Sequence, residues 1–76
     1  MSKVLLPELG EGITKATVAC WHKKKGERVK KNEDIVELVT DKATFNVPAE
    51  KGGVLKDILV MEGQEAAIGS VLAIIE

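Results

Sequence analysis

Lys42 is the side chain of this sequence best placed to do chemistry. It follows Asp41 in the four-residue stretch 40–43, and the residues on both sides favour strands. Asp suits the early positions of a tight turn, because its carboxylate accepts hydrogen bonds from nearby backbone N–H groups. The pattern predicts a hairpin that presents the Lys42 amine to solvent. On spacing alone, an exposed lysine on a hairpin more often serves only solubility, and this chain has ten lysines.

Other reactive side chains lack the partners that catalysis or metal binding requires. His22 has no Ser or Cys nucleophile at a recognisable spacing, which favours a surface role. Cys20 has no second cysteine with which to form a disulfide or a structural zinc site. No glycine cluster matches a phosphate-binding loop. The sequence therefore indicates a chain with no catalytic residues and no metal site of its own.

Composition and charge limit the class of protein further. The 76 residues carry a net charge of −1 and are 45% hydrophobic and 30% charged, which indicates one small globular domain. Nucleic-acid binding is not expected, because net positive charge and interleaved aromatic residues are both missing. No membrane span is expected, because no apolar run approaches the ~20 residues it needs. Residues 15–31 have a local charge of +6; we interpret them as a solvated loop, and a docking face for an acidic partner is the alternative.

Regularly spaced Gly, Pro and Asn residues divide the chain into short apolar segments. Most segments have four to eight residues and are rich in Val, Ile, Leu and Thr, which predicts the strands of a sandwich or barrel. The segment 23–37 lacks an apolar face of helical period, so we expect a turn, a very short strand, a second turn and a longer strand. That longer strand is expected at 35–40, and the other strands at 4–6, 16–21, 43–47, 54–61 and 71–75.

The two halves of the sequence resemble each other. Residues 6–13 align with 47–54 at an offset of 41, and later positions share an offset of 37. The first half then carries a four-residue insertion near 14–17. Such matches also arise by chance in β-rich chains; the alternative is two interlocked copies of a three-to-four-strand unit with quasi-twofold symmetry. The symmetry predicts that Lys42 and the chain termini lie at opposite ends of the domain.

Two motifs together resemble the lipoyl domains of the acyltransferase components of 2-oxo acid dehydrogenase complexes. The run Leu6-Pro7-Glu8-Leu9-Gly10-Glu11-Gly12-Ile13 is similar to the opening of these domains. The run Thr40-Asp41-Lys42-Ala43 is similar to the hairpin motif that carries lipoate on its lysine. The resemblance covers essentially all 76 residues and departs from the family at Val39, where Glu is frequent. Asp41 and Ala43 argue against the related biotin carriers, which are expected to have Met on both sides of the lysine.

The resemblance implies an all-β fold and a carrier function. The implied fold is a flattened β-barrel, or barrel-sandwich hybrid, of two four-stranded sheets with Lys42 on an exposed hairpin. Lipoate in amide linkage on Lys42 would receive an acyl group from a thiamine-diphosphate-dependent 2-oxo acid decarboxylase. It would deliver that group to coenzyme A at the acyltransferase core and be reoxidised by dihydrolipoamide dehydrogenase. The domain itself would be non-catalytic. By the resemblance, the Gly-Glu-Gly opening favours complexes that act on pyruvate or branched-chain 2-oxo acids over 2-oxoglutarate, and the expected parent is the acetyltransferase of a pyruvate complex.

The resemblance also implies where partners bind. A lipoate ligase or lipoyl transferase is expected to recognise Thr40, Asp41 and Ala43 around Lys42. Recognition by the ligase and partner enzymes is expected to extend to the loop at Leu9, Gly10, Glu11 and Gly12.

Residues 1–76 are expected to form one monomeric carrier domain in the N-terminal part of a longer chain. The expected location is the bacterial cytoplasm, or the mitochondrial matrix if the protein is eukaryotic. Three alternatives stay open. They are a lipoyl domain fused to dihydrolipoamide dehydrogenase, a biotin carrier domain, and an unmodified structural relative.

Overall fold

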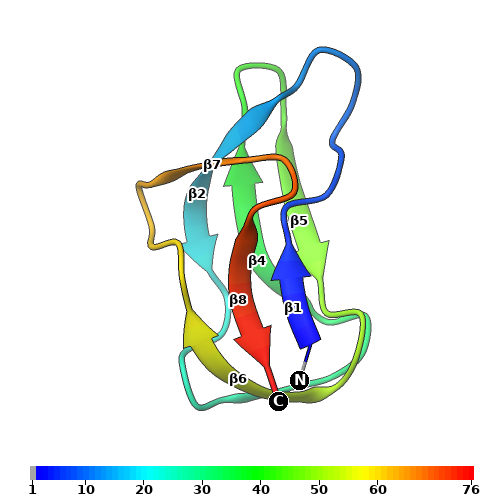
Figure 1. The fold of residues 1–76 in the computed structure, drawn as a ribbon, viewed down its shortest axis with the longest axis vertical. Helices are drawn as coiled ribbons and strands as arrows, with labels where there is room; N and C mark the ends of the chain where they lie inside the picture. The colour runs from blue at the N-terminus through cyan, green and yellow to red at the C-terminus, as the bar shows by residue number, and fades with distance from the viewer. Residues whose placement is uncertain (1) are drawn as a thin grey trace.

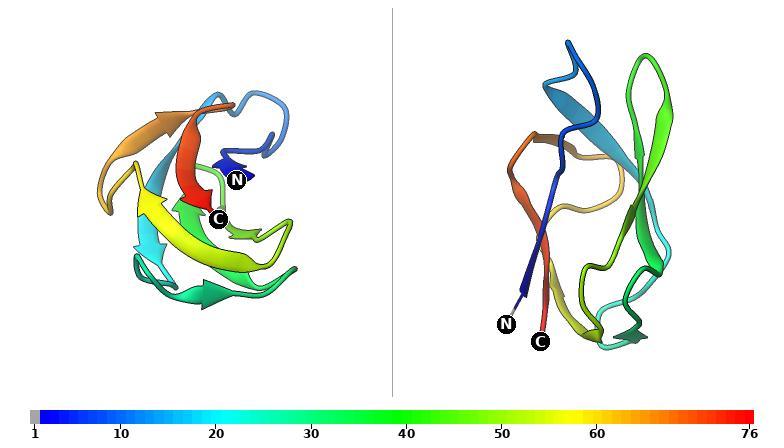
Figure 2. Two further views of the ribbon diagram at one scale, coloured as in Figure 1. Left: turned by 60° about the horizontal axis from the view of Figure 1, so that its bottom comes forward. Right: turned by 90° about the vertical axis from the view of Figure 1, so that its right-hand side faces the viewer.

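Eight short strands form two four-stranded sheets in the computed structural model, which describes residues 2–76. One sheet has the strand order β1-β8-β6-β3 and the other β5-β4-β2-β7, with antiparallel neighbours throughout. The two curved sheets face each other around a common interior (Figures 1 and 2). No helix occurs in residues 2–76, and the flattened all-β barrel predicted above is confirmed. The strands are β1 (Ser2–Leu5), β2 (Lys15–Trp21), β3 (Arg28–Val29), β4 (Asp34–Val39), β5 (Thr44–Pro48), β6 (Gly53–Ile58), β7 (Glu65–Ala67) and β8 (Val71–Ile75).

The strands bury one apolar core between the two sheets. Most strands alternate buried and exposed side chains, as the two-residue period of a strand requires. The largest fully buried side chains come from both sheets and include Val18, Ile35, Leu38, Leu55 and Leu72. Within residues 2–76 no polar or charged residue is buried. Any chemistry of this domain must therefore take place on its surface.

The strand pattern follows the predicted segments with one omission. The segment 23–37 contains the very short strand β3 and the longer β4, separated by turns, as predicted. Strand β7 was not among the predicted segments, because it has three residues and a single buried side chain, Ala66. A strand this short gives too little alternation to be recognised from sequence.

The quasi-twofold relation between the halves is present in the structure. Strands β2, β3 and β4 correspond to β6, β7 and β8 at the predicted offset of 37. The Gly26 N–H donates to the Leu55 carbonyl at 2.7 Å, and the Gly63 N–H donates to the Val18 carbonyl at 2.8 Å. These are the same hydrogen bond in the two halves, made by glycines with φ of 93° and 87°. Each bond joins one half to the other, so the two units are interlocked.

The first strands of the two halves are related by a different offset from the predicted one. Val4 pairs with Ala73 and Val47 pairs with Val36, and Ala73 lies 37 positions after Val36. Val4 therefore corresponds to Val47 at an offset of 43, so the predicted 41 is wrong by two residues. A shift of two residues keeps the same side chains on the buried face of the strand, so the alternation in the sequence does not reveal the wrong offset. The insertion in the first half has six residues instead of four and forms the long loop 6–14 between β1 and β2.

The hairpin of β4 and β5 and the ends of the chain lie at opposite ends of the molecule. Figure 1 shows the β4–β5 turn and the loop 6–14 at one end, with the start of β1 and the end of β8 at the other. The longest dimension of the domain is 32 Å. This placement agrees with the prediction from symmetry and leaves the Lys42 turn clear of the chain ends.

Candidate functional site

The candidate site is the tip of the β4–β5 hairpin. Val39 pairs with Thr44 at the end of the ladder, so the strands stay in register up to the turn. The Thr40 N–H donates to the Ala43 carbonyl at 2.8 Å and closes a tight turn over residues 40–43. The predicted hairpin is therefore present, with Lys42 in its turn.

The hydroxyl of Thr40 holds the turn together. Its Oγ1 accepts hydrogen bonds from the N–H groups of Lys42 at 3.2 Å and Ala43 at 3.0 Å. It also lies 3.0 Å from the Ala43 carbonyl, to which it can donate. The sequence predicts this local hydrogen bonding for the Asp41 carboxylate, whereas the structure assigns it to the Thr40 hydroxyl. The signal was available, since Thr hydroxyls bond the backbone two and three residues ahead at turns.

The Lys42 side chain is exposed and lies against the loop 6–14. Asp41, Lys42 and Ala43 are all exposed, and Thr40 is half-buried. None of the ion pairs found within residues 2–76 involves Lys42. Its Nζ lies 3.3 Å from the place that a Cβ would occupy on Gly12. A side chain at position 12 would therefore crowd the Lys42 amine.

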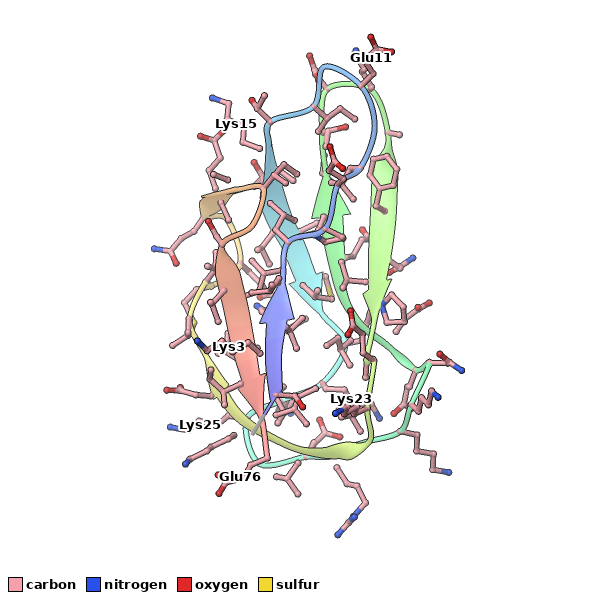
Figure 3. All side chains as sticks on the ribbon, turned by 45° about the vertical axis from the view of Figure 1, so that its right-hand side comes forward. Lys3, Glu11, Lys15, Lys23, Lys25 and Glu76 are labelled. Atoms are coloured by element: carbon pink, nitrogen blue, oxygen red, sulfur yellow. The ribbon has the colours of Figure 1, made fainter. Side chains whose placement is uncertain are left out.

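The loop 6–14 brings only some of the predicted recognition residues to the hairpin. Leu9 is half-buried and packs against the core, which anchors the loop. Gly10 and Gly12 have φ of 143° and 82°, values that favour glycine, and Gly12 makes the approach to Lys42. Glu11 is exposed at the end of the molecule that carries the hairpin (Figure 3). The predicted surface thus contains Glu11 and Gly12, whereas Leu9 serves as an anchor.

A shallow recess adjoins the hairpin on the side of β2. Gly12, Ile13 and Thr14 line it from the loop, and Val39 lines it from the end of β4. The ion pair between Lys15 and Glu65, at 3.4 Å, borders it. Val39, the position at which the sequence departs from the lipoyl pattern, is exposed here. The side chain at position 39 can therefore contact a partner that approaches the hairpin.

Other titratable residues do not join this site. His22 lies 2.9 Å from the Asn46 Oδ1 through its Nε2, and Cys20 is a half-buried free thiol. Among residues 2–76, no cluster of side chains could hold a metal ion. The described residues also include no helix long and apolar enough to cross a membrane. The chemistry that the site offers is acylation of an exposed amine on a rigid turn.

The comparisons with known proteins agree with this geometry. A family model described as "Biotin-requiring enzyme" matches residues 2–75. The dihydrolipoyllysine-residue succinyltransferase component of the 2-oxoglutarate dehydrogenase complex of Staphylococcus saprophyticus is 44% identical over 75 residues, covering 99% of this chain and 18% of the relative. The same component of Escherichia coli K12 is 47% identical over 60 residues, covering 79% of this chain and 15% of the relative.

A solved structure has the same fold. The lipoyl domain of the 2-oxoglutarate dehydrogenase complex from Azotobacter vinelandii superposes with a TM-score of 0.80 and 39% sequence identity. The match covers 100% of this chain and 96% of that domain. The chain spans less than a fifth of the length of the two full-length relatives named above.

Proposed function

The chain belongs to the biotin- and lipoyl-carrier family as a lipoyl domain of the 2-oxo acid dehydrogenase type, and from this premise we propose that Lys42 is its lipoyl-attachment residue. Lipoyl domains carry lipoate covalently on a lysine. The observation that carries the proposal is the exposed Lys42 side chain in a turn. The backbone of this turn is fixed because the N–H groups of Lys42 and Ala43 both donate to the Thr40 hydroxyl. The surroundings fit an amide-linked arm, because Lys42 has no ion pair within residues 2–76 to break.

The domain contributes position to the reaction. When attached, lipoate supplies a cyclic disulfide that takes up an acyl group and is later reoxidised. Thr40 fixes the backbone around Lys42, and the hairpin turn lies at the opposite end of the molecule from the chain ends. Tethering raises the effective concentration of the arm at each partner active site. Amide formation removes the charge of Lys42 and changes the net charge of the chain from −1 to −2.

The parent protein in this proposal is a longer acyltransferase component that acts on succinyl groups from 2-oxoglutarate. The relatives named above support succinyl transfer, whereas the Gly-Glu-Gly opening of the sequence favoured pyruvate. The proposed partners are a lipoate ligase or transferase, the decarboxylase component, the acyltransferase core and dihydrolipoamide dehydrogenase. Reductive acylation of the lipoylated domain should be faster with a 2-oxoglutarate decarboxylase component than with a pyruvate component. The opposite preference would contradict the proposed substrate and leave the carrier function standing.

Intact mass after incubation with lipoate, ATP and a lipoate ligase tests the attachment site. The wild-type chain should gain one lipoyl group, and the Lys42→Ala variant should gain none. Incubation with biotin, ATP and a biotin ligase should leave both masses unchanged. A lipoyl group on both proteins would place the site on another lysine, and biotin on the wild type would contradict the lipoyl proposal.

A second test asks whether the position of the lysine in the turn matters. Exchange of Asp41 and Lys42 keeps the composition and charge of the hairpin and moves the amine by one residue. We expect the exchanged protein to fold and to resist lipoylation, because the ligase reads a lysine at one place on the turn. Normal modification of the exchanged protein would show that the ligase accepts any exposed lysine at the tip.

A further inference from the structure

A groove lies where the two halves of the molecule meet, away from the hairpin. Equivalent positions of the two halves, related by the offset of 37, form most of its walls. The three pairs are Trp21 with Ile58, Lys24 with Met61, and Lys25 with Glu62. A groove lined by equivalent residues straddles the quasi-twofold axis, and we call it the axial groove. Figure 3 shows Lys25 toward the end of the molecule opposite to Glu11.

The backbone walls of the axial groove are alike, because the two halves use the same turn. The Lys24 N–H donates to the Glu27 Oε1 at 2.8 Å, and the Met61 N–H donates to the Gln64 Oε1 at 2.8 Å. Glu27 and Gln64 are themselves 37 residues apart. Position 24 and position 61 are therefore presented in the same way, and only the side chains differ. The wall from the first half carries the Lys24 ammonium group, and the wall from the second half carries the Met61 thioether at the equivalent position.

The second half and Trp21 give the groove an apolar surface. Met61 is 58% exposed, the most exposed of the large hydrophobic residues within 2–76. Trp21 is half-buried, and its Nε1 donates to the Val60 carbonyl at 2.9 Å, so the open part of the indole has no polar atom left to satisfy. The Glu62 carboxylate accepts a hydrogen bond from the backbone N–H of Trp21 at 2.9 Å. An exposed Met beside a half-buried Trp in one recess is typical of surfaces that bind apolar groups.

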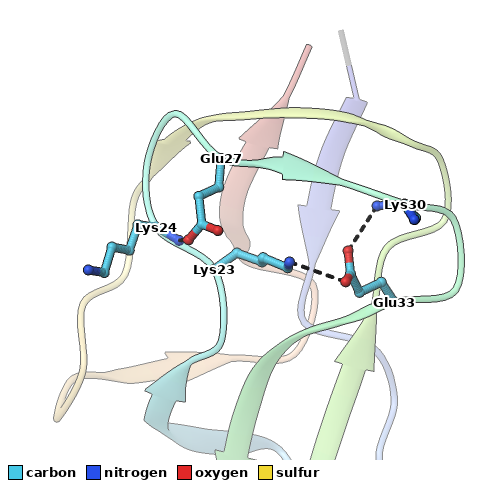
Figure 4. A network of polar contacts seen from close by, with 5 residues as sticks. All are labelled: Lys23, Lys24, Glu27, Lys30 and Glu33. Atoms are coloured by element: carbon cyan, nitrogen blue, oxygen red, sulfur yellow. Dashed lines mark hydrogen bonds and ion pairs between the residues drawn. The ribbon is translucent and has the colours of Figure 1, made fainter.

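The first half supplies positive charge beside this apolar surface. Lys23 is engaged by Glu33, with an Nζ–Oε2 distance of 3.1 Å. Lys25 is 4.0 Å from Asp57, with a side chain 70% exposed, so this pair is weak. Lys24 forms none of the ion pairs found within residues 2–76, and Figure 4 shows its side chain pointing away from the Lys23–Glu33 pair. The groove therefore has cations available next to uncovered hydrocarbon.

We propose that the axial groove docks a segment of a partner protein in which apolar side chains are flanked by carboxylates. The apolar side chains cover Trp21 and Met61, and the carboxylates reach Lys24 and Lys25. The groove shares no lining residue with the recess beside the hairpin, so a partner held in the groove leaves Lys42 accessible. The proposal does not depend on lipoylation, and its failure would leave the function of Lys42 unaffected.

Trp21 is the only tryptophan of the chain, so its fluorescence reports directly on the axial groove. The probe is a capped peptide with the sequence Glu-Asp-Leu-Leu-Asp-Glu. We expect a saturable change in Trp21 emission that weakens as the ionic strength rises, because salt screens the lysine–carboxylate attraction. Peptides with Ser in place of Leu, or with Gln and Asn in place of the acids, should bind at least about threefold more weakly.

Two pairs of variants locate the binding surface. Lys24→Glu and Met61→Ser should each weaken binding by about threefold to tenfold. Lys31→Glu and Leu59→Ser make the same chemical changes at exposed residues outside the groove and should leave binding unchanged. All four side chains are exposed, so the fold is expected to survive each substitution.

Three results would overturn the proposal. One is the absence of a saturable emission change up to about 1 mM peptide, the weak end of specific binding. Another is an equal loss of binding in Lys31→Glu and Lys24→Glu, which would indicate general attraction to the basic segment 15–31. The third is an emission change with protein concentration alone, together with a larger sedimentation coefficient, which would assign the groove to a second copy of this chain.

Discussion

Thr40 is the residue whose side chain fixes the backbone of the hairpin turn. Its hydroxyl accepts from two backbone N–H groups and lies within bonding distance of the Ala43 carbonyl. Thr40→Val removes these bonds with almost no change in shape. We expect a loss of about 1 kcal/mol in the free energy of unfolding, the usual net value for such hydrogen bonds. Amide hydrogen exchange at Lys42 and Ala43 should become faster, and lipoylation should slow.

The matched control for this variant is Thr40→Ser. Ser keeps the hydroxyl and should retain slow exchange at Lys42 and Ala43, together with normal lipoylation. Chemical denaturation, amide exchange and intact mass give the three readouts. Equal behaviour of the Val and Ser variants would show that the hydroxyl does not hold the turn.

Glu33, which lies far from the hairpin, makes the stability of the domain depend on pH. A hydrogen bond from the Lys30 N–H lowers the pKa of Glu33 below 4.5, and the neighbouring Lys23 ammonium lowers this pKa further. Figure 4 shows both contacts. A carboxylate with a depressed pKa in the folded state stabilises the fold above its unfolded-state pKa. That contribution is lost as the pH falls through the folded-state value.

Glu33→Gln should therefore lower the melting temperature at pH 7, because the charge on Glu33 is removed. The difference between wild type and variant should shrink as the pH falls below 4.5 and vanish once Glu33 is protonated in both folded and unfolded wild-type chains. Thermal unfolding followed by circular dichroism from pH 7 to about pH 2 measures this difference. A difference that is constant across the range would show that charge is not the cause.

At the scale of elements, the loop 6–14 and the β4–β5 hairpin act as one unit. They meet where Gly12 lies next to the Lys42 Nζ. Gly12→Ala adds a methyl group 3.3 Å from that nitrogen at a residue with φ of 82°. Gly63→Ala adds the same methyl group at a φ of 87°, with no other atom within 4 Å. Both variants should lose about 1 to 2 kcal/mol through backbone strain, because the left-handed region disfavours a Cβ.

Only Gly12→Ala should change the reaction of Lys42. The added methyl group displaces the amine, so the ligase should show a higher KM for this variant and an unchanged KM for Gly63→Ala. Steady-state lipoylation kinetics with both proteins, each checked by denaturation, separate the two effects. Equal KM values for the two variants would show that the loop does not position the lysine.

The sequence predicts most elements correctly because their signals are local. Strand alternation and the breakers between segments indicate seven of the eight strands, and Asp41-Lys42 between two strand-like segments indicates the exposed turn. The place of Gly12 in a loop was predicted from the spacing of the breaker residues and from the insertion in the first half. Its contact with Lys42 depends on how β1 and β2 are placed relative to β4, which no local pattern encodes. The role of Thr40 was missed because Asp41 has an equally good turn signal.

At the scale of the whole molecule, one offset of the internal repeat is predicted correctly from the sequence and the other is not. The offset of 37 is correct because three strands and two turns, including Gly26 and Gly63, all obey it. The offset of the first strand was wrong by two, because the alignment of Pro7 with Pro48 outweighed the weak alternation of one short strand. Only the strand pairing within each sheet, Val4 with Ala73 and Val47 with Val36, corrects it.

The same interlocking predicts how the whole molecule folds. The six strand pairs include only two within a half, β2–β4 and β6–β8, whereas β1–β8, β2–β7, β3–β6 and β4–β5 join the two halves. A fragment of residues 1–41 would leave β1 and β3 without partners, and residues 42–76 would do the same to β5 and β7. Two paired strands with one apolar face are not stable in water. Each fragment alone should therefore be unfolded, with poorly dispersed amide proton signals.

An equimolar mixture of the two fragments should refold, because the cut lies in the exposed turn and leaves all six strand pairs available. Dispersed amide signals close to those of the intact chain, with one copy of each fragment per complex, would be the expected result. A dispersed spectrum from either fragment alone would contradict the interlocked fold. Failure of the mixture to refold would show that the Lys42 turn must stay covalently closed for the sheets to pair. The hairpin would then be a structural requirement of the fold as well as the place where the arm is attached.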